Sequence, residues 1–190
     1  MLKKVVYLDF DNTLVDTVYA GCCYMYYEHD IPLVNGMDIE KYSFAPLFDV
    51  PSILDMFENE HLFHNLYVYP DMWRLLIFLK ENGFKIIIPT YCLSEKSKQW
   101  KKDWFENNPL VTEYIDEVIY LDKEDKSKID MEGCIIIDDL PKYHDMSNAS
   151  LKLSYKHYPK AGWYPTQVDV TVSDNVNILI NKIKSVYNIK

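Results

Sequence analysis

The sequence predicts an α/β domain in which a parallel sheet is flanked by helices. Short apolar runs rich in β-branched residues alternate along the chain with segments of helical periodicity. Several of these runs end directly in acidic or hydroxyl residues, as buried strands of a parallel sheet do where their carboxyl ends form a ligand site. At 190 residues the chain has room for one domain with an insertion, and a core of that size needs neither disulfides nor a metal.

The first strand is expected at residues 5–8, a continuously apolar run that ends at Asp9. A helix is expected over residues 16–29. Between residues 30 and 69 the periodicity breaks up, with prolines and scattered aromatic residues, and we interpret this stretch as inserted short helices. The predicted organisation is therefore an α/β core of residues 1–16 and 70–190 with a small helical cap of residues 17–69.

Regular alternation resumes at Pro70. A helix is expected from there to Asn82-Gly83, because its apolar residues recur at i, i+3, i+4 and i+7 and the glycine suits a helix C-terminus. Further strands are expected at residues 84–88, 118–121 and 134–137, with weaker ones at 151–153 and 168–172. Ser94 is expected to cap a helix that runs to about residue 107, and Ser173 or Asp174 to cap the last helix.

The net charge of −9 and the pI near 5.0 argue against non-specific binding to long nucleic acid, which needs a basic face. They do not exclude a small phosphorylated ligand, because a divalent cation can bridge acidic groups to a phosphate. No segment approaches the roughly 20 apolar residues of a membrane helix, and the apolar run after Lys3-Lys4 is too short for a signal peptide. We expect a cytoplasmic protein, either a monomer or a homodimer, without a membrane partner.

The polar residues at the ends of the predicted strands suggest one chemistry. Because the carboxyl ends of neighbouring parallel strands meet at one edge, carboxylates, a hydroxyl and an ammonium group should converge there. Clustered carboxylates need a cation, and hard oxygen ligands favour Mg²⁺. This set suits phosphoryl transfer, in which an aspartate can also be the nucleophile. In chain order, the residues are Asp9 and Asp11, then Thr90, then Lys123, Lys126 or Lys128, and then Asp138 and Asp139.

In this order the motifs resemble the haloacid dehalogenase-like (HAD) hydrolase superfamily, whose core is a Rossmann-like parallel sheet. The resemblance implies that Asp9 is the nucleophile and Asp11 the general acid/base. It implies that Thr90 binds the transferring phosphoryl group and that Lys126 offsets the negative charge on Asp9.

The same resemblance implies a Mg²⁺ ion held by Asp9, the backbone carbonyl of Asp11, and the pair Asp138 and Asp139. Adjacent strand residues point to opposite sides, so one member of the pair should ligate directly. We favour Asp139, with Asp138 orienting water or Lys126. An acidic residue at position 11 is typical of phosphatases and phosphomutases in this superfamily.

A closer resemblance is to the 5′(3′)-deoxyribonucleotidase family. It is carried by three segments: Phe63-His64-Asn65-Leu66 before Pro70, Asp125-Lys126-Ser127, and Ile137-Asp138-Asp139. The sequence departs from that family at Asp71, where glycine is usual. The resemblance implies hydrolysis of a nucleoside monophosphate.

Aromatic residues of such a site would stack on a nucleobase. The candidates for the pocket walls are Phe44, Phe63 and Tyr91. On the helix after Thr90, Lys98 is a candidate to reach the substrate phosphate, and we interpret the lysines at 96, 101 and 102 as a solvated face.

Other functions remain open at this stage. The same mechanism could act on a sugar phosphate, another small metabolite or a polynucleotide 3′ end, and a mutase is a further alternative. A phospho-receiver domain also places acidic residues, a threonine and a lysine at strand ends, but there the acidic pair comes first in the chain, whereas here it comes last. A non-catalytic phosphate-binding module is the remaining alternative.

Overall fold

The computed structural model describes residues 2–33, 50–158 and 168–190, and in it six parallel strands form one sheet in the order β3-β2-β1-β4-β5-β6. The α/β class with a Rossmann-like parallel sheet is confirmed. The strands are β1 (Val5–Leu8), β2 (Lys85–Tyr91), β3 (Glu117–Leu121), β4 (Ile135–Ile137), β5 (Leu151–Tyr155) and β6 (Thr171–Ser173).

Strand β1 lies in the middle of the sheet, between β2 and β4. Its residues alternate between two apolar clusters, because successive side chains of a strand point to opposite faces. Val6 and Leu8 are buried in the large cluster, and Tyr7 belongs to a smaller one on the other face. The central position brings the carboxyl ends of β1, β2 and β4 next to one another.

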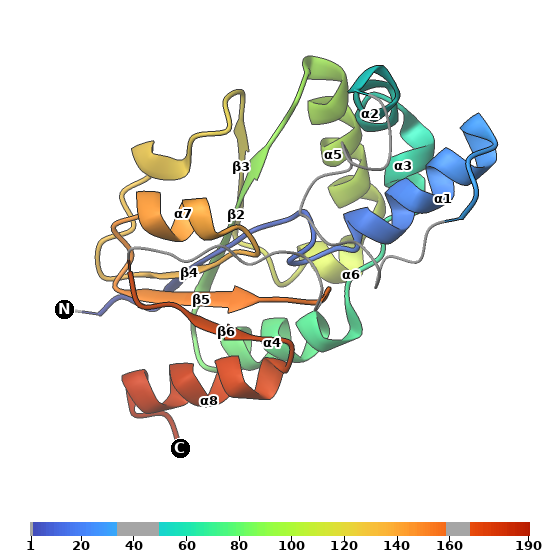
Figure 1. Cartoon of the computed structure of the whole chain (residues 1–190). Coiled ribbons are helices and arrows are strands. Elements are labelled where there is room, and N and C mark those ends of the chain that lie inside the picture. The colour runs from blue at the N-terminus through green and yellow to red at the C-terminus, as the bar shows by residue number, and fades with distance from the viewer. Residues whose placement is uncertain (1, 34–49, 159–167) are drawn as a thin grey trace.

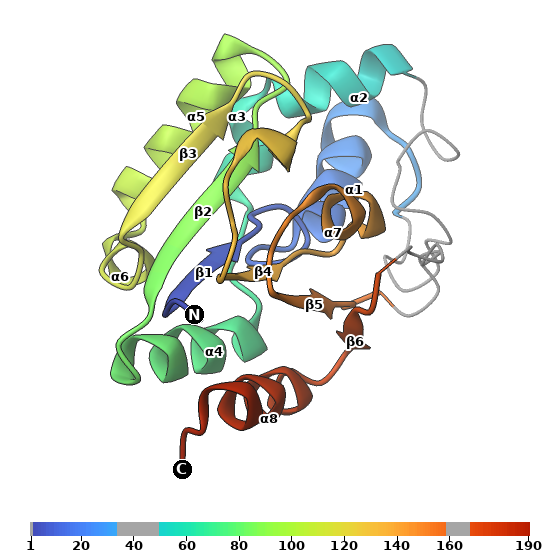
Figure 2. The same cartoon turned by 90° about the vertical axis from the view of Figure 1, so that its left-hand side faces the viewer.

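Helices cover both faces of this sheet (Figures 1 and 2). Helices α4 and α8 pack against each other below the sheet in Figure 1, and α7 lies above β4 and β5. The helices are α1 (Thr17–His29), α2 (Val50–Phe57), α3 (Glu60–His64), α4 (Pro70–Glu81), α5 (Glu95–Asn107), α6 (Pro109–Thr112), α7 (Pro141–Met146) and α8 (Val176–Tyr187), together with the 3₁₀ turn η2 (Lys126–Lys128).

The ends of two predicted helices follow from local chemistry. Gly83 follows α4 with φ at 73°, a left-handed conformation that glycine adopts without steric cost. The Ser94 side chain accepts a hydrogen bond from Ser97 N at 3.2 Å and so caps α5. The predicted cap of α8 at Ser173 or Asp174 is wrong, because Asn175 caps that helix by accepting from Asn177 N at 3.0 Å.

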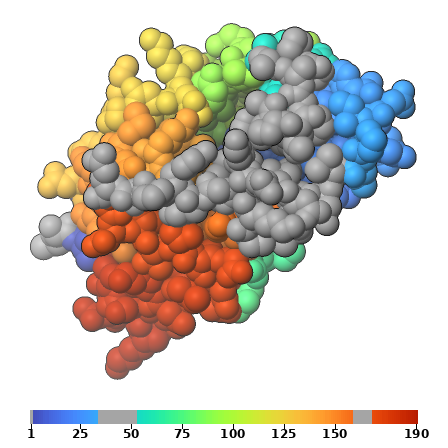
Figure 3. All heavy atoms as spheres, in the orientation of Figure 1, coloured from blue at the N-terminus to red at the C-terminus, as the bar shows by residue number. Residues whose placement is uncertain are grey.

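Helices α1, α2 and α3 lie between β1 and α4 in the chain, within residues 17–69, and α1 packs against both of the others. In Figure 1 they lie together at one end of the sheet, beside α5. Figure 3 shows the same view in space-filling form, with α1 at the right-hand edge and residues 168–190 forming the lower part of the face. The division into core and cap stays a prediction.

Candidate active site

Three buried carboxylates meet at the carboxyl edge of the sheet. Asp9 directly follows β1, and Asp138 and Asp139 directly follow β4. The backbone N–H of Asp9 donates to the carbonyl oxygen of Ile137 at 2.9 Å, which holds the two strand ends side by side. One oxygen from each of the three carboxylates lies within 4.8 Å of the others. This spacing suits a single oxygen-coordinated cation.

Lys126 inserts its ammonium group between two of these carboxylates. Its Nζ donates to Asp9 Oδ1 and, at 2.6 Å, to Asp138 Oδ2. The residue stands in η2, whose first turn is held by the Asp125 side chain accepting from Ser127 N at 3.0 Å. Lys126 is only 1% exposed, so its charge acts with little screening by water.

Asp138 and Asp139 take different positions in this cluster. The Asp138 carboxylate is occupied on both oxygens, because Oδ2 accepts from Lys126 and Oδ1 accepts from Leu140 N at 2.9 Å. Asp139 instead lines a cavity, as Asp9 does. The role of Asp139 as the direct metal ligand stays a prediction.

The cluster carries more negative charge than Lys126 offsets. The pKa of Asp9 is raised to about 7, chiefly by burial and also by the neighbouring carboxylates of Asp138 and Asp11, against the opposing effect of Lys126. Burial, followed by Asp138 and Asp9, also raises the pKa of Asp139 well above its ordinary value. Oxygen ligands and excess negative charge fit a hard divalent cation such as Mg²⁺.

Asp11 belongs to the loop that connects β1 to α1. Asn12 has a φ of 56°, a left-handed conformation that asparagine tolerates, and its Oδ1 accepts from Val18 N at 2.9 Å in the first turn of α1. The Asp11 Oδ1 accepts a hydrogen bond of 2.8 Å from Thr17 Oγ1. The loop is therefore tied to the start of α1 through the side chains of Asp11 and Asn12.

The position of Lys101 shows that one interpretation of the sequence is wrong. We expected a solvated residue, but Lys101 is 2% exposed and its Nζ lies 2.5 Å from Asp11 Oδ2 and 2.7 Å from Thr90 Oγ1. The periodicity of α5 is the sequence signal that indicates the burial of Lys101. The buried residues of that helix recur every three or four positions and so share one face: Ser97, Lys101, Trp104 and Phe105.

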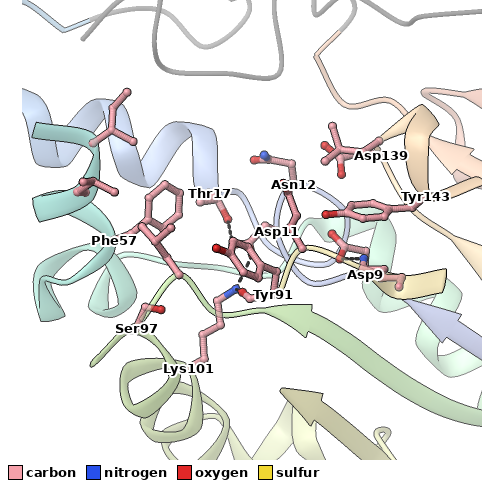
Figure 4. A pocket seen from close by; sticks show the side chains of 16 residues that line it. Asp9, Asp11, Asn12, Thr17, Phe57, Tyr91, Ser97, Lys101, Asp139 and Tyr143 are labelled. Carbon is pink, nitrogen blue, oxygen red and sulfur yellow. Dashed lines mark hydrogen bonds and ion pairs between the residues drawn. The ribbon is translucent and has the colours of Figure 1, made fainter. Parts of the chain in front are cut away.

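A cavity of about 300 Å³ opens above these groups. Figure 4 shows Asp9, Asp139 and Tyr143 on one side of the Asp11–Asn12 loop, Phe57 on the other side, and Lys101 rising from α5 toward Asp11. The polar floor faces an apolar wall from α2 and from the turn after β2. The lining residues are Asp9, Asp11, Asn12, Thr17, Ile53, Leu54, Phe57, Tyr91, Leu93, Ser97, Lys101, Glu124, Lys126, Asp139, Leu140 and Tyr143.

The predicted substrate-binding residues do not all line the cavity. Tyr91 lines the cavity. Phe63 is 3% exposed and faces a different depression, with Trp100 and Trp104. Lys98 also lies outside the cavity lining, because its Nζ pairs with Asp122 at 3.0 Å and with Glu95 at 3.5 Å.

Phe44 lies outside the described residues. Phe57 is the aromatic wall residue that our sequence interpretation missed, together with the leucines at 54 and 93. No pattern in the sequence around α2 indicated which of its residues would face the acidic edge of the sheet.

Comparison with known proteins supports the fold. No profile of a known protein family matches the sequence, and no curated protein does. Solved structures do match. A "predicted phosphatase" from Clostridium acetobutylicum has 20% identity and a TM-score of 0.62, covering 97% of this chain and 100% of that one. YfnB from Bacillus subtilis, described as a HAD hydrolase bound to magnesium, has 11% identity and a TM-score of 0.63, covering 96% and 99%.

A HAD-superfamily hydrolase from Ehrlichia chaffeensis matches at 16% identity with a TM-score of 0.53, covering 97% of this chain and 98% of that one. The architecture is therefore the HAD hydrolase fold over nearly the whole length of the chain. Within the part of the chain that the structure describes, no helix is long and apolar enough to cross a membrane.

Proposed function

We propose that this protein is a Mg²⁺-dependent phosphomonoesterase that works through an aspartyl-phosphate on Asp9. The observation that carries the proposal is the convergence of Asp9, Lys126 and Asp139 at the floor of one cavity, with Asp11 facing the same space. Lys126 offsets the charge of Asp9, so that an anionic phosphate can approach an anionic nucleophile.

The reaction has two steps. In the first, Asp9 attacks phosphorus, the ester P–O bond breaks, and a proton from Asp11 goes to the departing oxygen to release the alcohol. In the second, Asp11 accepts a proton from water as the water oxygen attacks the aspartyl-phosphate, which releases inorganic phosphate and restores Asp9. Thr90 donates a hydrogen bond to the transferring phosphoryl group in both steps.

Asp9, Asp139 and the backbone carbonyl of Asp11 would hold the Mg²⁺, with Asp138 acting through Lys126 and water. When bound, the ion neutralises charge on the phosphoryl oxygens and aligns them with the nucleophile.

We further propose that the substrate is a nucleoside monophosphate, and that a deoxyribonucleotide is favoured. The apolar side of the cavity supports a leaving group with a flat, uncharged face: Phe57 lines it, and Leu54 and Leu93 remain 46% and 38% exposed at its edge. The cations among the described lining residues are Lys101 and Lys126, and each already pairs with a carboxylate. This charge balance supports one phosphate group in preference to two.

Phosphate release from an aryl phosphate tests the reaction. The purified protein should release phosphate with Mg²⁺ and lose this activity in a chelator, and Asp9→Asn should abolish it. Asp174→Asn, which changes an exposed aspartate that precedes the cap of α8, is the matched control and should keep wild-type activity. Equal release with and without metal would refute the Mg²⁺-dependent mechanism.

A substrate panel tests the finer proposal. Deoxyribonucleoside 5′- and 3′-monophosphates, ribonucleotides, nucleoside bisphosphates and sugar phosphates should be compared by kcat/KM. We expect the highest kcat/KM for the nucleoside monophosphates and the lowest for the bisphosphates. A preference for sugar phosphates would keep the reaction and assign the enzyme to the alternative class of small phosphorylated metabolites.

A further inference from the structure

The ammonium group of Lys101 is fully used by three acceptors. Its Nζ lies 2.5 Å from Asp11 Oδ2, 2.7 Å from Thr90 Oγ1 and 2.7 Å from the backbone carbonyl oxygen of Tyr91. An ammonium group has three protons to donate and no lone pair to accept with. None of its protons is therefore left for the substrate, although Lys101 lines the cavity.

This arrangement fixes the direction of the Thr90 hydroxyl. Since Lys101 can only donate, Thr90 Oγ1 is the acceptor in their 2.7 Å hydrogen bond. The single hydroxyl proton of Thr90 must then point elsewhere. Thr90 is the next-to-last residue of β2 and is fully buried at the edge of the sheet where the phosphoryl group would lie. Its proton is therefore directed by Lys101 before the phosphoryl group arrives and does not need to be reoriented during the reaction.

The same ammonium group holds the general acid/base. Asp11 Oδ2 accepts from Lys101, and the carboxylate still has 29% of its side-chain surface exposed toward the cavity. Lys101 itself is almost inaccessible to water, with 3% of its side-chain surface exposed. A buried cation thus joins a carboxylate on the β1 loop to a hydroxyl at the end of β2, and the two groups keep a fixed separation.

We propose that Lys101 is a positioning residue that orients the Thr90 proton and the Asp11 carboxylate for phosphoryl transfer, a role distinct from the charge compensation by Lys126. The inference rests on the proposed phosphatase function. The two lysines act on different partners, because Lys126 bonds Asp9 and Asp138 whereas Lys101 bonds Asp11 and Thr90.

Lys101→Met tests this role, with Lys102→Met as the matched control one residue along α5. Methionine keeps most of the length and removes the donors, and Asp11 is exposed enough to be hydrated, so the fold should be retained. We expect kcat to fall about 10- to 100-fold while KM changes less than about threefold, since oriented donors act mainly in the transition state. Lys102, which lies 5.6 Å from the centre of the Tyr120 ring, should tolerate the change.

Coupling to Thr90 separates positioning from a purely structural effect. In a Thr90→Val background, Lys101→Met should lower kcat by a smaller factor than it does in the wild type, because the Thr90 proton is already gone and only the effect of Lys101 on Asp11 remains. Lys101→Arg, which keeps the charge and donors, should recover part of the activity. Additive losses in the double variant, or a loss confined to KM, would overturn the inference.

A binding measurement keeps this test apart from the test of the proposed function. The shift in melting temperature on adding beryllium fluoride with Mg²⁺ should be smaller in Lys101→Met than in the wild type, while the shift with Mg²⁺ alone should be equal. If the wild type binds beryllium fluoride but releases no phosphate, the proposed function fails. The role of Lys101 is then still tested by the difference in melting-temperature shift between Lys101→Met and the wild type. Equal shifts with beryllium fluoride in the two proteins would overturn the role of Lys101, and no shift in the wild type would overturn both proposals.

Discussion

The hydroxyl of Tyr24 donates a hydrogen bond of 2.6 Å to Asp55 Oδ2, and this bond joins α1 to α2. On α2, Leu54 lies one residue before Asp55 and Phe57 two residues after it, and both form part of the apolar wall of the cavity. The position of that wall relative to the acidic floor therefore depends in part on a polar contact outside the cavity.

Tyr24→Phe should loosen the wall without unfolding the protein. A hydrogen bond of this kind contributes about 0.5–1.5 kcal/mol, and Asp55, 59% exposed, can be hydrated instead. We expect KM for an aryl phosphate to rise about two- to tenfold, the range that this energy corresponds to. Tyr27→Phe, at a residue 74% exposed on the same helix, is the control. An equal rise in KM for acetyl phosphate, which has no large leaving group, would show that the effect does not come from the apolar wall.

Phe57→Ala should weaken the binding of substrates with large apolar leaving groups. Losing part of an aromatic contact costs about 1 kcal/mol, so KM for an aryl phosphate should rise about fivefold. Acetyl phosphate should be turned over as by the wild type. Leu110→Ala removes an apolar side chain that is 71% exposed and serves as the control. If both phosphates were affected equally, Phe57 would not be a leaving-group contact.

The metal-free protein should lose stability as the pH rises toward neutrality. The pKa of Asp9 is raised from 3.8 to about 7, and that of Asp139 is raised in the same direction. Between these values the folded state binds more protons than the unfolded state, so the free energy of unfolding falls as the pH increases. Urea unfolding over this pH range in a chelator measures the decline.

Mg²⁺ should remove most of that decline, because the cation replaces the protons on the same carboxylates. Asp139→Asn should also flatten it in the chelator and should abolish the stabilisation by Mg²⁺. Stability that rises with pH in the metal-free wild type would show that the carboxylate cluster does not carry this excess charge.

Lys126→Met should destabilise the metal-free protein by about 3–5 kcal/mol, since it leaves buried carboxylates without their counter-ion. Adding Asp138→Asn should recover part of the loss, because Lys126 donates to Asp138 at 2.6 Å. Chemical denaturation of the single and double variants measures both effects. A strictly additive double variant would mean that the two side chains do not interact energetically.

The sequence predicted the strands that carry the chemistry because each combines an apolar run with a polar end. Such a run has no alternative to burial, so Asp9, Thr90 and Asp138 were placed at strand ends without knowledge of the fold. The capping residue Ser94 was predicted for a similar reason: the signal is local.

Long-range placement was harder to predict. Lys101 looked like a member of a basic helix face, and only the packing of α5 against the β1 loop directs it to Asp11. Phe63 looked like a pocket wall, but it is buried among other aromatic residues, because apolar side chains are equally suited to a core and to a binding site. Helix α7 is short and has no hydrophobic periodicity by which to predict it.

The central place of β1 in the sheet has a consequence during protein synthesis. Asp9 is synthesised long before its neighbour β4 and the pair Asp138 and Asp139. A nascent chain that has reached β2 carries Asp9, the proposed nucleophile, and Thr90, but neither Lys126 nor the pair proposed to bind the metal. A ribosome-bound fragment that ends before β4 should therefore be catalytically inert, and activity should emerge late, when the last site residues leave the exit tunnel and β4 pairs with β1.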